Sequence, residues 1–288
     1  MKLLEGKRIG LIGKPSDWLV ASSPDTQLIE ERLGVQIIQV SIEELITDIR
    51  KNPDQGSKVD IEALTEGAND IQEATQNDLN EAGATLQALR SIIKKYQLDA
   101  ITVRCFDLVV ELETTGCFAL SQLLDEGLIA GCEGDLVSTI GMMAAQELTS
   151  QVPWMANPAQ IDEVGNSFWL AHCTVPRTLV ESYSIRSHFE SGLGVGIQGF
   201  IEDGPVTVFR LGGEDIEKIW VSEGDIVARG NSEKLCRTQV EIKLSDGIIS
   251  DLLNRPLGNH LVMVKGHMRS VIMRWFETEV SSSLERVT

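Results

Sequence analysis

Two acidic residues, Glu133 and Asp135, stand close together in the segment CEGD, directly after a short apolar run and before a helical pattern. Carboxylates at the end of a buried strand are a common arrangement for binding a metal ion or for acid–base chemistry. Asp135 also has a structural interpretation as the N-cap of the following helix, since a carboxylate there accepts hydrogen bonds from the first backbone amides. The sequence leaves both interpretations open.

Other residues that could bind a metal lie further along the chain. Glu111 and Glu113 precede the CEGD segment and could equally be solvated, whereas His172 in FWLAHCTV and His260 in PLGNHLVMV lie on or beside later apolar runs. His172 shares a strand face with apolar residues, a setting that fits a buried core histidine as well as a ligand. Two carboxylates and two imidazoles together would suit a divalent cation such as Mn²⁺, Fe²⁺ or Co²⁺, with positions left for water or substrate.

The elements that must position these residues alternate in the first half of the chain. Short apolar runs with helical patterns between them predict strands at KRIGLIG, VQIIQV, DAITVRC and LIAGCEGD. Such alternation predicts a parallel, Rossmann-like sheet that binds ligands at the carboxyl ends of its strands, where residues 104–116 and 131–136 fall. Between residues 60 and 98 the apolar spacing predicts two helices, separated near Gly67 or Gly83.

The second half of the chain has a different pattern. After about Pro153, short alternating apolar runs are separated by Gly-containing turns, which is typical of an antiparallel sheet or a small barrel. We therefore predict an α/β fold with a parallel-sheet domain at 1–152 and a mainly antiparallel β-barrel domain at 153–280. We expect the metal site in the cleft between the two domains, and a disordered tail at 281–288.

Charge and composition exclude several classes of function. The chain has 288 residues, with 25 Lys and Arg against 43 Asp and Glu, and its formal net charge is −18. Binding to nucleic acids or to anionic membranes depends on clustered cationic residues, so neither is expected. The five cysteines are widely scattered, which predicts reduced thiols. No run is apolar enough for a secretory signal or a membrane span, so we expect a cytoplasmic protein.

Several motifs occur in an order that resembles a known family. They are RCFDLVVELETTGC, DEGLIAGCEGD, LAHCTVP, SHFESGLGVGIQG, LCRTQVEIKL and PLGNH. Together they resemble the catalytic and C-terminal part of the L-fucose isomerase and L-arabinose isomerase superfamily, most closely its shorter fucose-isomerase-like members. The resemblance covers residues 99–278 well and residues 1–98 loosely.

This resemblance implies a metal-dependent aldose–ketose isomerase. Enzymes of the superfamily hold a divalent metal, usually Mn²⁺, with two acidic residues and one or two histidines. Carried over to this sequence, the metal ligands are Glu111, with Glu113 as its rival, together with Asp135, His172 and His260. One of the two carboxylates, Glu111 or Asp135, would also move the proton between C1 and C2 of an open-chain sugar through a cis-enediol, while the metal polarises the carbonyl.

Further polar residues are candidates for contacts with the sugar. On a barrel strand alternate residues share one face, so the side chains of Arg237, Gln239 and Glu241 should lie together, toward either the substrate or the solvent. The full set of candidates is Arg104, Glu133, His188, Arg237, Gln239 and Glu241.

The long isomerases of the superfamily carry a leading α/β domain, and in hexameric members a neighbouring subunit's copy of that domain walls the substrate site. We expect this chain to lack that leading domain. We expect a free sugar of the L-fucose or L-arabinose type as substrate and a homo-oligomer that closes the site. Two alternatives remain: a catalytically altered sugar-binding protein, and one subunit of a two-chain isomerase whose partner supplies the missing domain.

Overall fold

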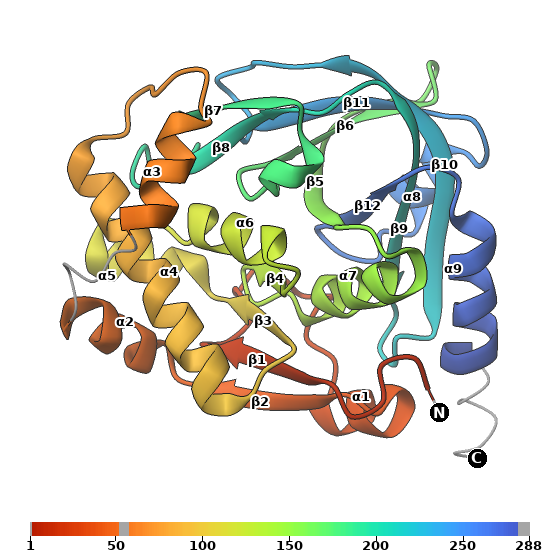
Figure 1. Ribbon diagram of the computed structural model, residues 1–288. Helices are drawn as coiled ribbons and strands as arrows, with labels where there is room; N and C mark the ends of the chain where they lie inside the picture. The colour runs from red at the N-terminus through yellow and green to blue at the C-terminus, as the bar shows by residue number, and fades with distance from the viewer. Residues whose placement is uncertain (1, 52–57, 282–288) are drawn as a thin grey trace.

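The computed structural model describes residues 2–51 and 58–281, and it confirms the predicted combination of a parallel α/β sheet and an antiparallel barrel (Figure 1). All strands of the first sheet run parallel. β3 and β4 are buried along their whole length, as expected for strands whose sheet is covered by helices. The order across the sheet is β2 (Gln36–Val40), β1 (Arg8–Ile12), β3 (Ala100–Val103) and β4 (Ile129–Cys132).

Helices connect these strands. α4 begins at a capping box, in which the Thr75 side chain accepts from the Asp78 amide and the Asp78 side chain accepts from the Thr75 amide. The predicted separation of two helices lies near Gly67, whereas Gly83 is inside α4, because the capping box starts this helix upstream of it. The helices are α1 (Thr26–Leu33), α2 (Ile42–Lys51), α3 (Lys58–Glu66), α4 (Gln76–Tyr96), α5 (Cys105–Leu112), α6 (Cys117–Asp125) and α7 (Leu136–Thr149).

The barrel is closed, and its neighbouring strands pair antiparallel. On β11 the side chains of Val240, Ile242 and Leu244 belong to the hydrophobic core, so the residues between them face away from it. The order around the barrel is β10 (Lys218–Arg229), β11 (Thr238–Leu244), β6 (Ser167–His172), β5 (Trp154–Asp162), β12 (Leu261–Lys265) and β9 (Gly204–Gly212). A separate ribbon consists of β7 (Ser182–Arg186) and β8 (Gly196–Phe200).

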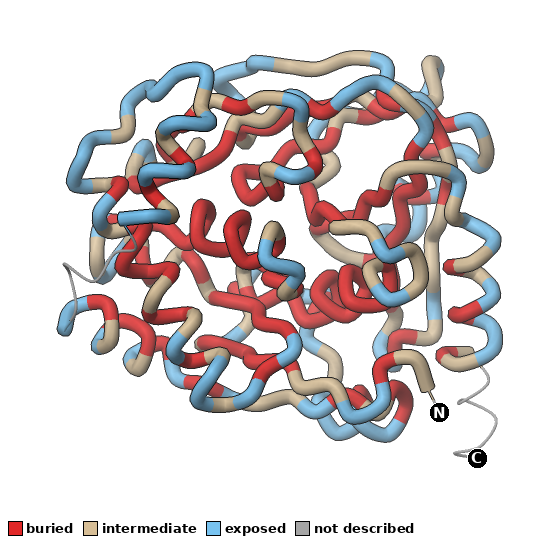
Figure 2. Tube along the Cα trace, in the orientation of Figure 1, coloured by how far each residue is buried: buried red, intermediate tan, exposed pale blue. Residues whose placement is uncertain are grey.

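Helix α7 packs between the sheet and the barrel. It contacts β3 and β4 on one side and β9 and β12 on the other, and its residues from Leu136 to Ala145 are buried (Figure 2). A Cβ added at Gly141 would stand 3.3 Å from Val262 and 3.4 Å from Phe209, so the missing side chain permits this close approach. Because the CEGD segment directly precedes α7, its two carboxylates lie where the sheet meets the barrel.

One segment of the α/β half differs from the arrangement expected from the sequence. Residues 104–116 were expected to offer polar side chains at the end of a strand, but most of them form helix α5. A helix directs its successive side chains around an axis, so residues late in α5 no longer lie at the edge of the sheet.

The C-terminal segment forms α9 (Arg269–Trp275), followed by a π-helical turn, η3 (Phe276–Val280). Two short elements complete the fold, η2 (Arg177–Leu179) and α8 (Ile249–Asn254). The predicted disordered tail lies, from residue 282 on, outside the described residues, and the division into domains at residue 152 stays a prediction. None of the helices in the described part of the chain is long and apolar enough to cross a membrane.

Candidate metal centre

Glu133 lies in the tight turn between β4 and α7, at the carboxyl edge of the parallel sheet. Its backbone adopts the left-handed conformation, with a φ of 62°, which is uncommon for residues other than glycine and often marks functional positions. The amide of Ser16 donates to the carbonyl of Glu133 at 2.8 Å, and the amide of Gly134 donates to that of Val103 at 3.1 Å. These backbone hydrogen bonds therefore fix the position of the turn from which the side chain of Glu133 projects.

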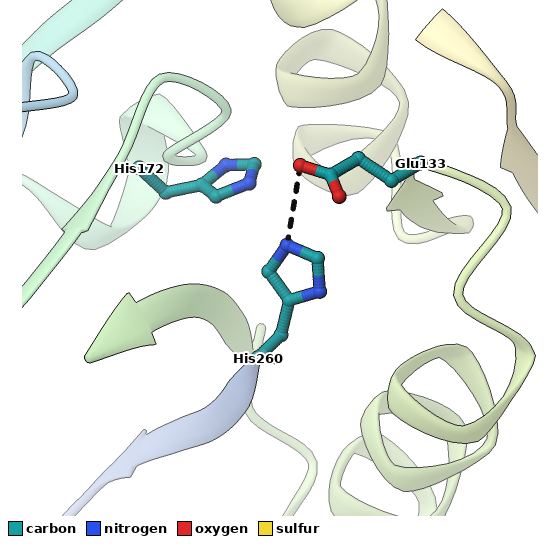
Figure 3. A group of neighbouring side chains, drawn as sticks. All are labelled: Glu133, His172 and His260. Atoms are coloured by element: carbon teal, nitrogen blue, oxygen red, sulfur yellow. Dashed lines mark ion pairs between the residues drawn. The ribbon is translucent and has the colours of Figure 1, made fainter. Parts of the chain in front are cut away.

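Two histidines of the barrel lie opposite this carboxylate (Figure 3). His172 is the last residue of β6, and His260 directly precedes β12. One ring nitrogen of each histidine and one oxygen of Glu133 all lie within 4.8 Å of one another, and the two ring centroids are 5.5 Å apart. We refer to Glu133, His172 and His260 as the Glu133 triad.

His172 is buried, and its ring is held by the residue two positions later. Its Nδ1 lies 2.6 Å from the hydroxyl of Thr174 and 3.3 Å from the Thr174 amide. Because the Thr174 amide donates to Nδ1, this nitrogen acts as an acceptor, and the two contacts with Thr174 hold the ring in place. Burial, together with the charge of nearby His260, lowers the pKa of His172 to about 4. The ring is therefore neutral near pH 7, as a metal ligand must be.

His260 is completely buried between two carboxylates. Its Nδ1 is 2.9 Å from Oδ2 of Asp135, and its Nε2 is 3.6 Å from Oε1 of Glu133. Burial alone would lower the pKa of His260, but the hydrogen bond to Asp135 and the charges of both carboxylates raise the pKa to about 9. Nε2 has no hydrogen-bond partner among the described residues. A buried polar atom without a partner is costly, and a divalent metal that displaced the Nε2 proton would satisfy this nitrogen.

Asp135 holds His260 from behind and is not part of the triad. Its carboxylate caps α7 by accepting from the Ser138 amide at 2.8 Å, which confirms the N-cap interpretation. It also pairs with Arg210 at 3.0 Å, and both of these side chains are 0% exposed. Burial would raise the pKa of Asp135, but the Arg210 guanidinium and His260 hold it well below its usual range. Asp135, expected as a metal ligand, thus contacts His260 at Nδ1, and its carboxylate orients this imidazole.

Arg210, on β9, links three separate segments to this carboxylate. Its guanidinium donates to the hydroxyl of Ser22 at 2.6 Å and to the carbonyl of His260 at 3.2 Å, and it contacts the hydroxyl of Ser138. A buried ion pair is tolerated when its remaining hydrogen-bonding groups are satisfied in this way. We refer to Asp135, Arg210 and His260 as the buried ion network.

A pocket opens beside the triad. Glu133 and His172 line it, together with His188, Glu190 and Asn157. All five cysteines of the chain also line this pocket, although they are spread over residues 105–236. They are free thiols, as predicted, so the pocket combines titratable groups with a soft, weakly polar wall.

Glu111 does not join the triad. It lies in the last turn of α5, where its side chain is 54% exposed and its carboxylate is 3.6 Å from the guanidinium of Arg50 on α2. Its rival Glu113 is the C-cap of the same helix, and neither residue lines the pocket. The structure places Glu111, expected as a metal ligand and proton carrier, apart from the triad, because a helix follows β3 and directs this residue toward α2.

The residues expected to contact the sugar separate into two groups. Glu133 and His188 line the pocket. Arg104, by contrast, pairs with Asp17 at 3.1 Å and with Asp107 at 3.0 Å, away from the pocket lining. Its positive charge is already neutralised by these two carboxylates.

Gln239 and Glu241 share one face of β11, as expected, and Arg237 lies just before the strand, but this face is opposite Val240 and Ile242 of the core. Apolar side chains take the interior because they gain most from leaving water. The three polar side chains bond to neighbours outside the pocket lining: Arg237 and Gln239 donate to the carbonyls of Ser187 and Ser232, and Glu241 accepts from Ser167.

Some residues of the site are not indicated by the sequence motifs. Arg210 has a usable signal, since a charge inside the apolar run PVTVFRLGG must be paired if the strand is buried. Asn157 and the convergence of the cysteines have none, because their sequence positions are unrelated. Trp18, whose indole N–H donates to Oε2 of Glu133 at 2.6 Å, stands in a polar loop without any recognisable pattern.

The donor set of the triad fits a divalent transition metal. One carboxylate and two imidazoles are the ligands that Mn²⁺, Fe²⁺ and Co²⁺ accept when coordination positions are left open. Two of the expected ligands, His172 and His260, are brought together, and the carboxylate that accompanies them is Glu133 instead of Glu111 or Asp135.

Comparison with known proteins gives distant relatives, and no family model matches the chain. A sulfoquinovose isomerase from Priestia megaterium is 24% identical over 280 residues, which cover 92% of this chain and 61% of the relative. A sulfoquinovose isomerase from Alkalicoccus urumqiensis is 23% identical over 225 residues, which cover 74% of this chain and 49% of the relative. The matches thus span about three-fifths or less of the length of these relatives.

One solved structure with a weak similarity to this chain is a dehydratase. A D-threo-3-hydroxyaspartate dehydratase from a Delftia species is 11% identical, with 90% of this chain and 57% of that chain covered and a TM-score of 0.19. A TM-score this low carries no argument about fold or function.

Proposed function

We propose that this chain is a metal-dependent aldose–ketose isomerase, or the catalytic part of one, that acts on a free sugar. The observation that carries the proposal is the Glu133 triad, which joins a carboxylate and two imidazoles beside a pocket and leaves one buried nitrogen unsatisfied. The name of the distant relatives, sulfoquinovose isomerase, supports the same class of reaction.

Glu133, His172 and His260 are the residues that would hold a divalent metal such as Mn²⁺. When bound, the metal supplies a Lewis acid that polarises the carbonyl of the sugar. The chain prepares the two imidazoles for this role: Asp135 accepts a hydrogen bond from Nδ1 of His260, and Thr174 contacts Nδ1 of His172. Partners of this kind fix the orientation of a ligand, and the carboxylate of Asp135 also keeps a proton of His260 on Nδ1.

We assign the proton transfer between C1 and C2 to Glu190. The resemblance gives this role to Glu111 or Asp135, but Glu111 pairs with Arg50 outside the pocket and Asp135 is enclosed behind His260. Glu190 is an exposed residue that lines the pocket and lies outside the triad. In a cis-enediol mechanism, one such carboxylate takes the proton from one carbon and returns it to the neighbouring carbon.

The charge of the pocket favours a neutral sugar of the L-fucose or L-arabinose type. Glu133 and Glu190 line the pocket, and its lining, as far as the chain is described, includes no Lys or Arg. The sulfonate of sulfoquinovose is an anion, and it would need a cationic partner that these residues do not supply. Closure of the site by a second copy of the chain belongs to the same proposal.

The proposal is tested by Mn²⁺ binding, measured by calorimetry, and by a sugar panel that includes L-fucose, L-arabinose and sulfoquinovose. We expect Mn²⁺-dependent conversion of a neutral sugar and no conversion of sulfoquinovose. Glu133→Gln removes a charged ligand, so Mn²⁺ affinity should fall by at least about 100-fold, the upper end of the loss seen for residues that merely support ligands. The matched variant Glu190→Gln should keep the wild-type Mn²⁺ affinity and lose turnover.

Other outcomes would contradict the proposal in different ways. A wild-type protein that binds none of Mn²⁺, Fe²⁺ and Co²⁺ would remove the metal centre. Tight sugar binding without turnover would favour the altered sugar-binding protein. Turnover that requires a second chain would favour the two-chain isomerase.

A further inference from the structure

Trp18 contacts the Glu133 triad from the loop between β1 and α1. Its indole N–H donates to Oε2 of Glu133 at 2.6 Å. The other oxygen of this carboxylate, Oε1, lies 3.6 Å from Nε2 of His260. The two oxygens thus have different surroundings: the indole holds one, and the other faces the unsatisfied ring nitrogen.

Aromatic contacts hold the indole in this position. The rings of Trp18 and Phe106 meet edge-to-face, with centroids 4.9 Å apart and an interplanar angle of 86°. Phe106 meets the ring of His188 in the same manner at 5.6 Å. Phe106 and His188 both line the pocket. Because such pairs are favoured beyond the area they bury, they fasten Trp18 to the pocket wall.

The loop that carries Trp18 is itself anchored by Arg104. The guanidinium of Arg104 donates to the carbonyl of Pro15 at 2.6 Å and pairs with Asp17 at 3.1 Å. The amide of Ser16 donates to the carbonyl of Glu133. Backbone and side chain of Glu133 are therefore both bonded to this loop, through Ser16 and Trp18.

We propose that Trp18 is a positioning residue of the metal centre: its indole N–H fixes the carboxylate of Glu133 so that the second oxygen is presented to a divalent metal. This inference rests on the proposed function, because it assumes that the triad binds metal. The exposure of Trp18, 45%, argues against a role in core packing, since a tryptophan of the core is buried, as Trp154 is at 0%.

Two variants separate the hydrogen bond from the ring. Trp18→Phe removes the N–H donor and keeps an aromatic ring beside Phe106, whereas Trp18→Leu removes both. Trp169→Phe is the matched control, because Trp169 is on β6 and, unlike Trp18, makes no hydrogen bond to Glu133. Mn²⁺ affinity, measured by calorimetry, should fall about tenfold in both Trp18 variants and keep the wild-type value in the control.

Two results of this experiment would overturn the role of Trp18. A loss in Trp18→Leu without a loss in Trp18→Phe would assign the effect to ring packing and not to the hydrogen bond. Wild-type affinity in both variants would remove the effect altogether. The thermal unfolding midpoint of each metal-free variant is measured alongside, and it should match wild type in Trp18→Phe.

Tryptophan emission provides a second readout that does not depend on activity. Co²⁺ bound at Glu133 would lie close to the indole of Trp18 and quench its emission. We expect the Co²⁺-dependent quenching to be much smaller in Trp18→Phe than in wild type and in Trp169→Phe. Equal quenching in all three would contradict the contact. If wild type binds neither Mn²⁺ nor Co²⁺, the metal centre of the proposed function fails as well; if it binds both and the Trp18 variants bind equally, the role of Trp18 alone fails.

Discussion

The two halves of the molecule bring their metal-binding groups to one place by different means. In the α/β half the backbone sets the position of the carboxylate. Glu133 adopts the left-handed conformation in a turn whose amides and carbonyls are hydrogen-bonded. In the barrel half side-chain contacts set the orientation, with Thr174 at His172 and Asp135 at His260. Since Asp135 comes from the α/β half, the imidazole of His260 is oriented correctly only when the two halves are packed together.

The two histidines of the barrel show the consequence of this dependence. His172 has no carboxylate as its hydrogen-bond partner, and burial lowers its pKa to about 4. His260 lies between two carboxylates of the α/β half, and its pKa is raised to about 9. Two chemically identical groups from the same barrel thus take opposite protonation states near pH 7, because the other half contacts only one of them closely.

Removing the guanidinium that joins the halves should have the largest effect. Arg210→Leu leaves the buried carboxylate of Asp135 without its cation, and a broken buried pair costs about 3–5 kcal/mol. Urea unfolding of the metal-free protein measures the loss. The control Arg269→Leu removes an ion pair to Asp246 whose side chains are 50% and 32% exposed, and it should cost about 1 kcal/mol or less. Similar losses in the two variants would show that the halves do not depend on Arg210.

Acid should reveal the difference between the histidines. The pKa of His172 is about 4 in the folded protein against 6.5 as its ordinary value, so between these values the unfolded chain binds a proton that the folded chain does not. Stability therefore falls as the pH is lowered through this window, by about 2 kcal/mol between pH 7 and pH 5. His260, with its raised pKa, stays protonated in the folded protein over the same range and gives no loss there.

Urea unfolding of metal-free protein at pH 7 and pH 5 measures this effect, with His172→Gln as the comparison. The variant should lose most of the pH dependence. If the free energy of unfolding of His172→Gln falls by the same amount between pH 7 and pH 5, other groups cause the acid sensitivity. The inferred difference in pKa between His172 and His260 would then be wrong.

The smallest effect is expected for the surface carboxylate that the resemblance favours as a ligand. Glu111→Gln should leave Mn²⁺ affinity unchanged. It should change stability by less than about 0.5 kcal/mol, because both side chains of the ion pair with Arg50 are more than half exposed. Calorimetry with Mn²⁺ decides the point. A loss of affinity as large as that expected for Glu133→Gln would restore Glu111 as a ligand and contradict the triad.

The sequence by itself determined the two kinds of sheet and several local features of the site. Continuous apolar runs predicted the buried strands β3 and β4, and short alternating runs predicted the barrel. The position of Asp135 before a helical pattern indicated its N-cap, and His172 and His260 stood out beside apolar runs. These features follow from interactions between residues close in sequence, which is why local patterns are sufficient to predict them.

Only the tertiary structure decided which carboxylate faces the histidines. Glu133 and Asp135 are both acidic and both follow β4, so their residue types do not separate them. Asp135 pairs with Arg210, 75 residues away, while the left-handed turn and the N–H of Trp18, 115 residues away, hold Glu133 at the pocket. The contact of Arg210 with Asp135 forms only when the barrel packs on α7, and that of Trp18 with Glu133 only when the β1–α1 loop folds over the edge of the sheet. No pattern of neighbouring residues encodes either contact.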